Sequence, residues 1–297
     1  MKAIVIGSDG VVGGALTQAL ADDGHVVYGT TRRPGRVGEN RLFLDLAAAD
    51  IGHVALPDVD IAFFCAAVVG FADCRKNPRL ARQVNVVGPV VAARRLVMRG
   101  ARVVLLSTSA VYDWSVPHAR ADRVPCPVTK YGELAAEAER GFADLGSGAS
   151  ILRLTKLLAV SSKLFSGWIA GLSRRREIAA FSDLHISPVS INDALNALRA
   201  IAANPAGGIY QVSGADDINY YDAASYLASR LGANGKLVLD RRAADAGIPR
   251  EEIPRFTSLD ASRLTNITGW SPPHAHDVID EVYGPMIKTA QARSVLP

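Results

Sequence analysis

The chain has 297 residues, 49% of them hydrophobic and 21% charged, with a formal net charge of +4. This composition is that of an ordinary globular protein with room for one or two cores. The basic residues are mostly scattered arginines, which favours local anion sites over a nucleic-acid-binding face. The longest apolar run, Ile61 to Ala72, is shorter than the roughly 18 residues of a membrane span. No signal-like apolar region forms before Asp9, so we expect a cytoplasmic protein.

The first residues predict a strand, a glycine turn and a helix. Ala3 to Ile6 form a short apolar run that suits a strand buried on both faces, and apolar residues at helical spacing follow from Val11 to Asp23. Unpaired N–H groups at the start of such a helix bind phosphate, and glycines let the backbone approach it. We therefore predict a dinucleotide site, with a tight turn that binds nothing as the alternative. The predicted contacts are Gly7, Asp9, Gly10, Val11, Val12 and Gly13.

The end of the second predicted strand, Val26 to Thr31, bears on the choice of cofactor. An acidic residue there would bind the ribose 2′-hydroxyl of NAD, but this chain has Thr31, Arg32 and Arg33, which suit a 2′-phosphate. NADP is therefore predicted ahead of NAD. Two arginines that are merely solvated in a surface loop are the alternative.

Further apolar runs predict the other strands of a parallel sheet: Leu42 to Asp45, Ile61 to Cys65, Val103 to Ser107 and Ile151 to Leu154. The run from Ile61 ends at Cys65 and is followed by the small residues Ala66 and Ala67, beside which a cofactor can lie. The run from Val103 ends at the hydroxyl of Ser107 and is followed by those of Thr108 and Ser109. Doubly wound sheets bind ligands at these carboxyl ends.

A long helix predicted over Pro78 to Arg99 carries two apolar stripes. One consists of Leu80, Val84, Val87 and Val91, and the other of Val86, Val90, Ala93 and Val97. One stripe can cover the sheet, so the second needs another partner. We assign the second stripe to the interface of a homodimer.

Metal and disulfide chemistry find little support in the sequence. The cysteines Cys65, Cys74 and Cys126 are odd in number and lack CxxC spacing, which indicates reduced thiols. His274 and His276 form an HxH pair without carboxylate or thiol neighbours, so no metal site is predicted.

Several short motifs together resemble the extended short-chain dehydrogenase/reductase family, and within it the dTDP-4-dehydrorhamnose reductase type. They are GSDGVVG (7–13), VNVVG (84–88), STSAVYD (107–113), PVTKYG (127–132), ILRLTK (151–156), SPVSINDA (187–194) and IYQVSG (209–214), followed by DASRL and GWSP near the C-terminus. The resemblance implies a doubly wound Rossmann domain over 1–160. It also implies a smaller C-terminal α/β substrate lobe over 161–297, interleaved with the last Rossmann elements at about 186–212. Asp45, Leu46, Asn85 and Ser107 become further cofactor contacts.

The resemblance also implies a catalytic trio of Ser/Thr, Tyr and Lys. Thr108 falls on the first position and Tyr131 on the second, but the lysine position four residues later holds Ala135. A second alignment puts Thr129 at the tyrosine and Glu133 at the lysine. Both alignments lack the lysine.

The missing lysine changes the predicted chemistry. A lysine one helical turn from Tyr131 would lower the pKa of the phenol, so without it Tyr131 should stay protonated near neutral pH. A phenol can donate a proton in a reduction. Lys156, after the sixth strand, either supplies a cation from another side or is a surface lysine.

Two functions remain open from the sequence. The first is an NADP-dependent reductase or epimerase-like enzyme that acts on a nucleotide sugar or a similar polar carbonyl compound. Its substrate contacts would be Thr108, Ser109 and Arg174, the last in a basic helix end that could also be simply solvated. The second is a dinucleotide-binding protein without standard redox activity, such as a regulatory subunit.

Overall fold

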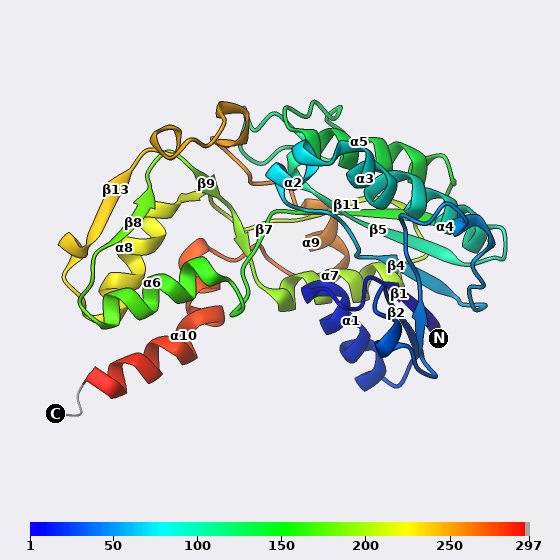
Figure 1. Ribbon diagram of the computed structural model, residues 1–297, viewed down its shortest axis with the longest axis horizontal. Helices are drawn as coiled ribbons and strands as arrows, with labels where there is room; N and C mark the ends of the chain where they lie inside the picture. The colour runs from blue at the N-terminus through cyan, green and yellow to red at the C-terminus, as the bar shows by residue number, and fades with distance from the viewer. Residues whose placement is uncertain (295–297) are drawn as a thin grey trace.

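The computed structural model describes residues 1–294 and contains a seven-stranded parallel sheet (Figure 1). The strand order is β11-β6-β5-β4-β1-β2-β3. The order reverses between β1 and β4, which makes the crevice at their carboxyl ends the expected ligand site of a doubly wound fold. The predicted Rossmann fold is confirmed. The strands are β1 (Lys2–Ile6), β2 (Val26–Thr31), β3 (Arg41–Phe43), β4 (Ile61–Phe64), β5 (Arg102–Thr108), β6 (Ala149–Leu154) and β11 (Gly208–Val212).

Helices cover both faces of this sheet because its central strands are apolar on both sides. In β1, Ile4 and Ile6 face one core and Ala3 and Val5 face the other, as the two-residue period of a strand requires. The first core is covered by α4 (Gly88–Val97) and α5 (Lys130–Ala143), and the second by α1 (Val11–Asp22) and α7 (Ile191–Ala203).

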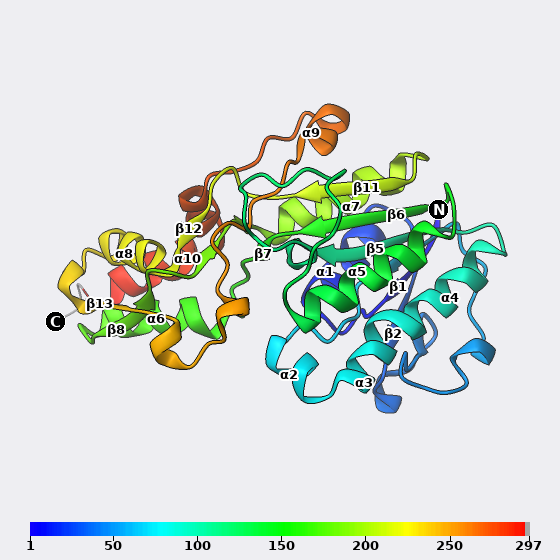
Figure 2. The same cartoon turned by 90° about the horizontal axis from the view of Figure 1, so that it is seen from above.

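A second lobe extends from the carboxyl side of the sheet and has its own core (Figures 1 and 2). Phe165, Trp168 and Tyr283 pack there, and the rings of Phe165 and Tyr283 stack with centroids 5.1 Å apart. The helices are α6 (Lys163–Ser173), α8 (Tyr220–Leu231) and α10 (Ala275–Ser294), beside the parallel pair β8 (Ile178–Phe181) and β13 (Val238–Arg241).

Two short strand pairs lie outside the seven-stranded sheet. β7 (Lys156–Leu157) pairs with β10 (Pro188–Val189), and β9 (His185–Ile186) pairs with β12 (Ile218–Asn219). The chain returns from the lobe to the sheet through α7 and β11, in the region predicted to be interleaved. A second return, α9 (Ser262–Thr268), packs against β11 and was not predicted.

The predicted helix from Pro78 to Arg99 is built from three parts. They are α3 (Pro78–Arg82), a π-helical stretch (Gln83–Val87) and α4, preceded by the short helix α2 (Phe71–Lys76). The second stripe, assigned above to a homodimer interface, packs largely within this chain, and the homodimer itself stays a prediction. Val86 and Ala93 are buried within this chain, and α5 lies so close that a Cβ on Gly141 would be 2.6 Å from Val90. In this fold the neighbouring helix on the same face supplies the second partner.

Residues 1–294 contain no helix with the length and apolar character required to cross a membrane.

Candidate functional site

A cleft of about 790 Å³ lies between the two lobes, at the carboxyl ends of the sheet strands. The Rossmann side contributes the glycine turn and the ends of β4, β5 and β6. The second lobe contributes parts of α6, β8 and β9. The predicted site residues that line the cleft are Gly10, Val11, Val12, Cys65, Ala67, Ser107, Thr108, Ser109, Tyr131 and Lys156.

The glycine turn is shaped to receive a phosphate. Gly10 stands at the N-cap of α1 and offers no side-chain cap, so the first N–H groups of the helix are left for a ligand. A Cβ on Gly13 would lie 2.3 Å from the carbonyl oxygen of Gly7, so only glycine allows this close approach. The residues present therefore fit the pyrophosphate of a dinucleotide.

A cluster of charged residues lies beyond the turn, at the end of β2. The Asp9 carboxylate accepts a hydrogen bond of 2.7 Å from the Thr31 hydroxyl and pairs with Arg36 and Arg41. The Thr31 hydrogen bond and the nearby arginines, Arg33 among them, hold the pKa of Asp9 below its usual value.

Arg32 and Arg33 are exposed beside this cluster. Arg36 and Arg41 were not predicted, because Arg41 joins the group only when β3 pairs with β2.

The loop after β4 is held in place by Asn85. Its side chain accepts a hydrogen bond of 2.7 Å from the Val68 N–H and donates one of 2.9 Å to the Val68 carbonyl. Asn85 lies in the π-helical stretch, a feature often found at functional sites. It was predicted as a cofactor contact, but its amide is occupied by this loop.

The other predicted cofactor residues have varied surroundings. Ala66 packs against the core, whereas Cys65 lines the cleft, and burial raises the pKa of the Cys65 thiol to about 12. Cys65 is therefore a thiol rather than a nucleophilic thiolate. Asp45 accepts a hydrogen bond from the Ala47 N–H after β3, and Leu46 is buried beneath the N-terminus of α4.

Thr108 and Tyr131 both line the cleft, and their side chains share a hydrogen bond. Thr108 ends β5, and its hydroxyl accepts a hydrogen bond of 3.2 Å from the Ala110 N–H. Tyr131 lies in the first turn of α5. A Cβ on Gly132 would lie 2.0 Å from the carbonyl oxygen of Ala110, so only glycine allows α5 to approach this segment.

The structure favours the first of the two alignments of the catalytic tyrosine. Thr129 is the N-cap of α5, where its side chain accepts a hydrogen bond of 3.1 Å from the Gly132 N–H. Glu133 is exposed and pairs with Lys130 at the surface. Neither Thr129 nor Glu133 lines the cleft, whereas Tyr131 does.

The Tyr131 phenol is protonated at neutral pH. Burial raises its pKa to about 12, and a hydrogen bond with Thr108 offsets only part of this shift. Neither Lys156 nor any other described cation contributes to the shift. Ala135 packs against a small core at Val111 and Tyr112. The idea that Lys156 replaces the missing lysine as a cation acting on Tyr131 therefore finds no support.

A buried ion pair beneath the cleft was missed by sequence reasoning. Arg153 and Glu139 form a salt bridge of 2.6 Å, with about 1% and 5% of their side chains exposed. Ser107 was predicted to contact the cofactor, but its hydroxyl donates a 2.5 Å hydrogen bond to Glu139. Arg153 also donates to the Tyr112 hydroxyl. The network ties β5 and β6 to α5, which carries Tyr131.

The wall formed by Trp114 was also not predicted. Trp114 lines the cleft, is 6% exposed and packs against Phe71, whose ring also contacts Tyr131. Its φ of 57° lies in the left-handed region, which is uncommon for a bulky residue and typical of strained functional sites. The indole Nε1 of Trp114 has no hydrogen-bond partner among the described residues.

A segment of the second lobe, residues 252–256, lies against this wall. Glu252 lines the cleft and forms an ion pair with Arg75 of α2, so one salt bridge joins the two lobes. The Phe256 N–H donates to the Trp114 carbonyl, and the His185 N–H donates to that of Pro254.

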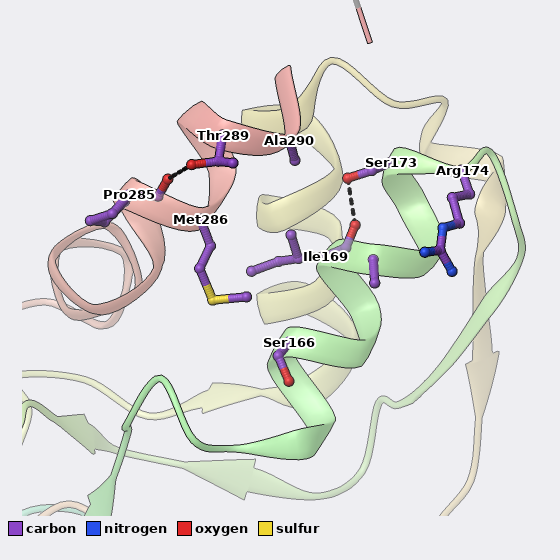
Figure 3. Close-up of a pocket in the computed structure, with 9 residues that line it drawn as sticks. Ser166, Ile169, Ser173, Arg174, Pro285, Met286, Thr289 and Ala290 are labelled. Atoms are coloured by element: carbon purple, nitrogen blue, oxygen red, sulfur yellow. Dashed lines mark hydrogen bonds between the residues drawn. The ribbon is translucent and has the colours of Figure 1, made fainter. Parts of the chain in front are cut away.

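Arg174 lies away from the cleft. It lines a second cavity of about 650 Å³ between α6 and α10, at the end of α6 (Figure 3). Ile169 and Met286 give this cavity an apolar floor. The structure therefore does not bring Arg174 together with Thr108, Ser109 and Tyr131.

The histidines of the HxH pair do not line the cleft. The imidazole of His274 lies 3.6 Å from the Asp216 carboxylate, and that of His276 stacks on Tyr226 with centroids 3.8 Å apart. Within residues 1–294 the structure holds no group of three or more His, Cys, Asp or Glu side chains suited to a metal ion.

Comparisons with known proteins find relatives along most of the chain. A Haloferax volcanii protein named "Probable low-salt glycan biosynthesis reductase Agl14" is 25% identical over 288 residues, which cover 93% of this chain and 95% of that protein. Methionine adenosyltransferase 2 subunit beta of Xenopus tropicalis is 24% identical over 279 residues, or 90% of this chain and 82% of that protein.

Solved structures share the fold. A dTDP-4-dehydrorhamnose reductase from Bacillus anthracis in complex with NADP superposes with a TM-score of 0.81 at 20% identity, covering 96% of this chain and 99% of that chain. MoeE5 in complex with UDP-glucose and NAD superposes with a TM-score of 0.79 at 19% identity. The match covers 99% of this chain and 100% of that chain.

The family model described as "RmlD substrate binding domain" matches residues 1–287, nearly the whole chain. This match bears out the resemblance read from the motifs, and it spans the glycine turn, Thr108, Tyr131 and the second lobe alike. The chain belongs to the RmlD substrate-binding-domain family.

Proposed function

We propose that this protein is a reductase that uses NADPH to reduce a carbonyl group in a nucleotide sugar or a similar polar compound. The observation that carries the proposal is the meeting of Thr108 and Tyr131 in the same cleft as the glycine turn. The relative in Haloferax volcanii is named as a reductase, which supports the reaction type.

The cofactor would lie along the carboxyl ends of the strands. Val11, Val12 and Gly13 would bind its pyrophosphate through their N–H groups, and Asn85 would hold the loop of Ala66 and Ala67 against it. When bound, NADPH supplies a hydride. Arg32 and Arg33 favour NADPH over NADH, since exposed arginines can bind a 2′-phosphate through two parallel hydrogen bonds.

The chain itself supplies the proton. The Thr108 hydroxyl orients the carbonyl oxygen, and the Tyr131 phenol donates its proton to that oxygen as negative charge develops there. Because burial raises the pKa of Tyr131 to about 12, the proton-donating form predominates at neutral pH. The buried pair of Arg153 and Glu139 keeps α5 fixed relative to β5.

The test is NADPH consumption with a panel of keto-sugar nucleotides and simpler keto compounds, measured beside cofactor binding by fluorescence. A reductase consumes NADPH with at least one compound, and Tyr131→Phe removes most of that activity while NADPH still binds. Tyr131→Phe with full activity would contradict the assigned proton donor.

A second function is favoured by one specific observation, the absence of the family's lysine at Ala135. Under this proposal the protein binds a dinucleotide as a subunit of another enzyme and performs no redox step. The relative in Xenopus tropicalis is named as a subunit of methionine adenosyltransferase. NADPH binding without consumption across the whole panel would favour this second function.

A further inference from the structure

Glu252 is the one acidic residue among the described residues that line the cleft. It belongs to a short helical turn, Arg250–Glu252, and only 10% of its side chain is exposed. Four residues later the Phe256 N–H donates to the Trp114 carbonyl, which holds this segment against the Rossmann side. The neighbouring Glu251 is exposed and does not line the cleft. Of two consecutive carboxylates, the fold therefore places one in the cleft.

One oxygen of the Glu252 carboxylate has a partner and the other does not. Arg75 of α2 forms an ion pair with Oε1. Oε2 makes no hydrogen bond or ion pair to a described residue, and it is not one of the described buried polar atoms that lack a partner. Oε2 is therefore accessible, and an ionised carboxylate oxygen is a strong hydrogen-bond acceptor.

Helix α2 links Glu252 to the proposed proton donor. Phe71 and Arg75 lie four residues apart in α2, so they share one face of this helix. The ring of Phe71 contacts that of Tyr131, with centroids 5.8 Å apart, while Arg75 pairs with Glu252. All but Arg75 of these four residues also line the cleft. A substrate whose carbonyl meets Tyr131 therefore lies on the side of the cleft where Glu252 stands.

The charges of the pair indicate which chemical group it would bind. A cationic group at Glu252 would be repelled by Arg75, and an anionic group such as a diphosphate would be repelled by the carboxylate. A neutral hydroxyl group meets neither repulsion. When it donates to the carboxylate it forms a charge-assisted hydrogen bond, which is stronger than one between neutral groups. The pair is therefore suited to the hydroxyl groups of a sugar.

We propose that Glu252 binds a hydroxyl group on the sugar of the substrate, with Arg75 holding the carboxylate in place. This inference rests on the proposed reductase function and narrows its substrate to a keto sugar rather than a simple ketone. A site that hydrogen-bonds a hydroxyl group rejects an analogue without it, because the acceptor in the protein is then left unpaired.

The experiment measures what the sugar adds to binding. Isothermal titration calorimetry compares UDP-glucose with UDP, and dTDP-glucose with dTDP, because glucose carries the hydroxyl groups of a keto sugar without its reactive carbonyl. With NADP present, the wild-type protein should bind one glucose nucleotide about 10- to 100-fold more tightly than the nucleotide alone, the usual range for a hydrogen bond to a charged group. Glu252→Gln should remove most of this advantage while the affinity for the nucleotide alone stays the same. Glu251→Gln is the matched control and should behave as the wild-type protein.

A second variant separates ligand binding from the joining of the lobes. Arg75→Met breaks the same ion pair but leaves the carboxylate in the cleft, so it should keep part of the advantage of the glucose nucleotide. If the pair serves only to join the lobes, Arg75→Met and Glu252→Gln will weaken the glucose nucleotide and the nucleotide alone equally. That result would overturn the proposal.

The outcomes for the reductase and for the hydroxyl site are distinct. A glucose advantage that depends on Glu252, without NADPH consumption on any keto sugar, supports the site and contradicts the reductase. NADPH consumption that Glu252→Gln leaves unchanged in KM supports the reductase and rejects the site. A wild-type protein that binds neither glucose nucleotide more tightly than the nucleotide alone also rejects the site.

Discussion

At the glycine turn the groups that face the cleft are backbone N–H groups and small residues, while the second lobe presents large side chains. The turn from Gly7 to Gly13 leaves no room even for a Cβ at Gly13. From the second lobe, Trp168 and Phe181 line the cleft. Backbone geometry suits the constant part of a reaction, the cofactor, whereas side chains can vary with the substrate.

The largest expected effect concerns Tyr131, the proposed proton donor. Tyr131→Phe should lower turnover by about 10² to 10⁴-fold, the usual contribution of general acid catalysis. NADPH affinity should stay unchanged, since the glycine turn is untouched. Tyr221→Phe, in the second lobe and outside the cleft lining, is the control. Steady-state kinetics and fluorescence titration measure the two quantities.

The second-largest expected effect tests the buried ion pair of Arg153 and Glu139 beneath the cleft. Arg153→Met leaves the Glu139 carboxylate buried without its partner, so the free energy of unfolding should fall by about 3 to 5 kcal/mol. Arg120→Met, which breaks an exposed pair with Asp122, should change stability little. Urea denaturation of both variants measures their free energies of unfolding. Equal stability of the two variants would show that the network does not hold α5 in place.

A smaller effect tests whether the backbone forms the cofactor site. Gly13→Ala places a methyl group against the Gly7 carbonyl, and the turn must move at a cost of about 1 to 3 kcal/mol. NADPH should therefore bind about 10- to 100-fold more weakly. Gly35→Ala has open space around its Cβ and should bind normally. Unchanged affinity in Gly13→Ala would place the pyrophosphate elsewhere.

Cofactor choice should change by about tenfold. Replacing Arg32 and Arg33 by alanine removes the charge-assisted contacts to a 2′-phosphate, so the ratio of NADPH to NADH affinity should fall by about that factor. NADH affinity itself should hardly change. If the wild-type protein binds both cofactors equally, the preference for NADPH is wrong.

The smallest effect near neutral pH concerns the buried tyrosines. Burial raises the pKa of Tyr112, Tyr131, Tyr220 and Tyr283 to about 12, above the unfolded value of about 10. The unfolded chain therefore releases these protons first, and stability is complete below about pH 10 and lost as the pH rises toward 12. Urea denaturation between about pH 10 and pH 12 should show this loss of stability. Turnover should show no tyrosine titration near neutral pH.

The sequence by itself determined the Rossmann fold, the glycine turn and the placement of Thr108 and Tyr131. These features are local: an apolar run, glycines at fixed spacing and a residue at the end of a strand are visible without knowledge of distant contacts. The absence of a lysine at Ala135 was likewise readable, and the raised pKa of Tyr131 agrees with the phenol expected from it.

Only the tertiary structure decided which distant residues meet. The stripe around Val90 has the same pattern whether it packs on α5 or on a second copy of the chain, so periodicity could not exclude the neighbouring helix. Arg153 and Glu139 look like surface charges in the sequence and become a buried pair when β6 packs against α5. Trp114, Lys156 and His185 come from three separate segments, and folding brings them to one cleft because the chain crosses between the lobes more than once.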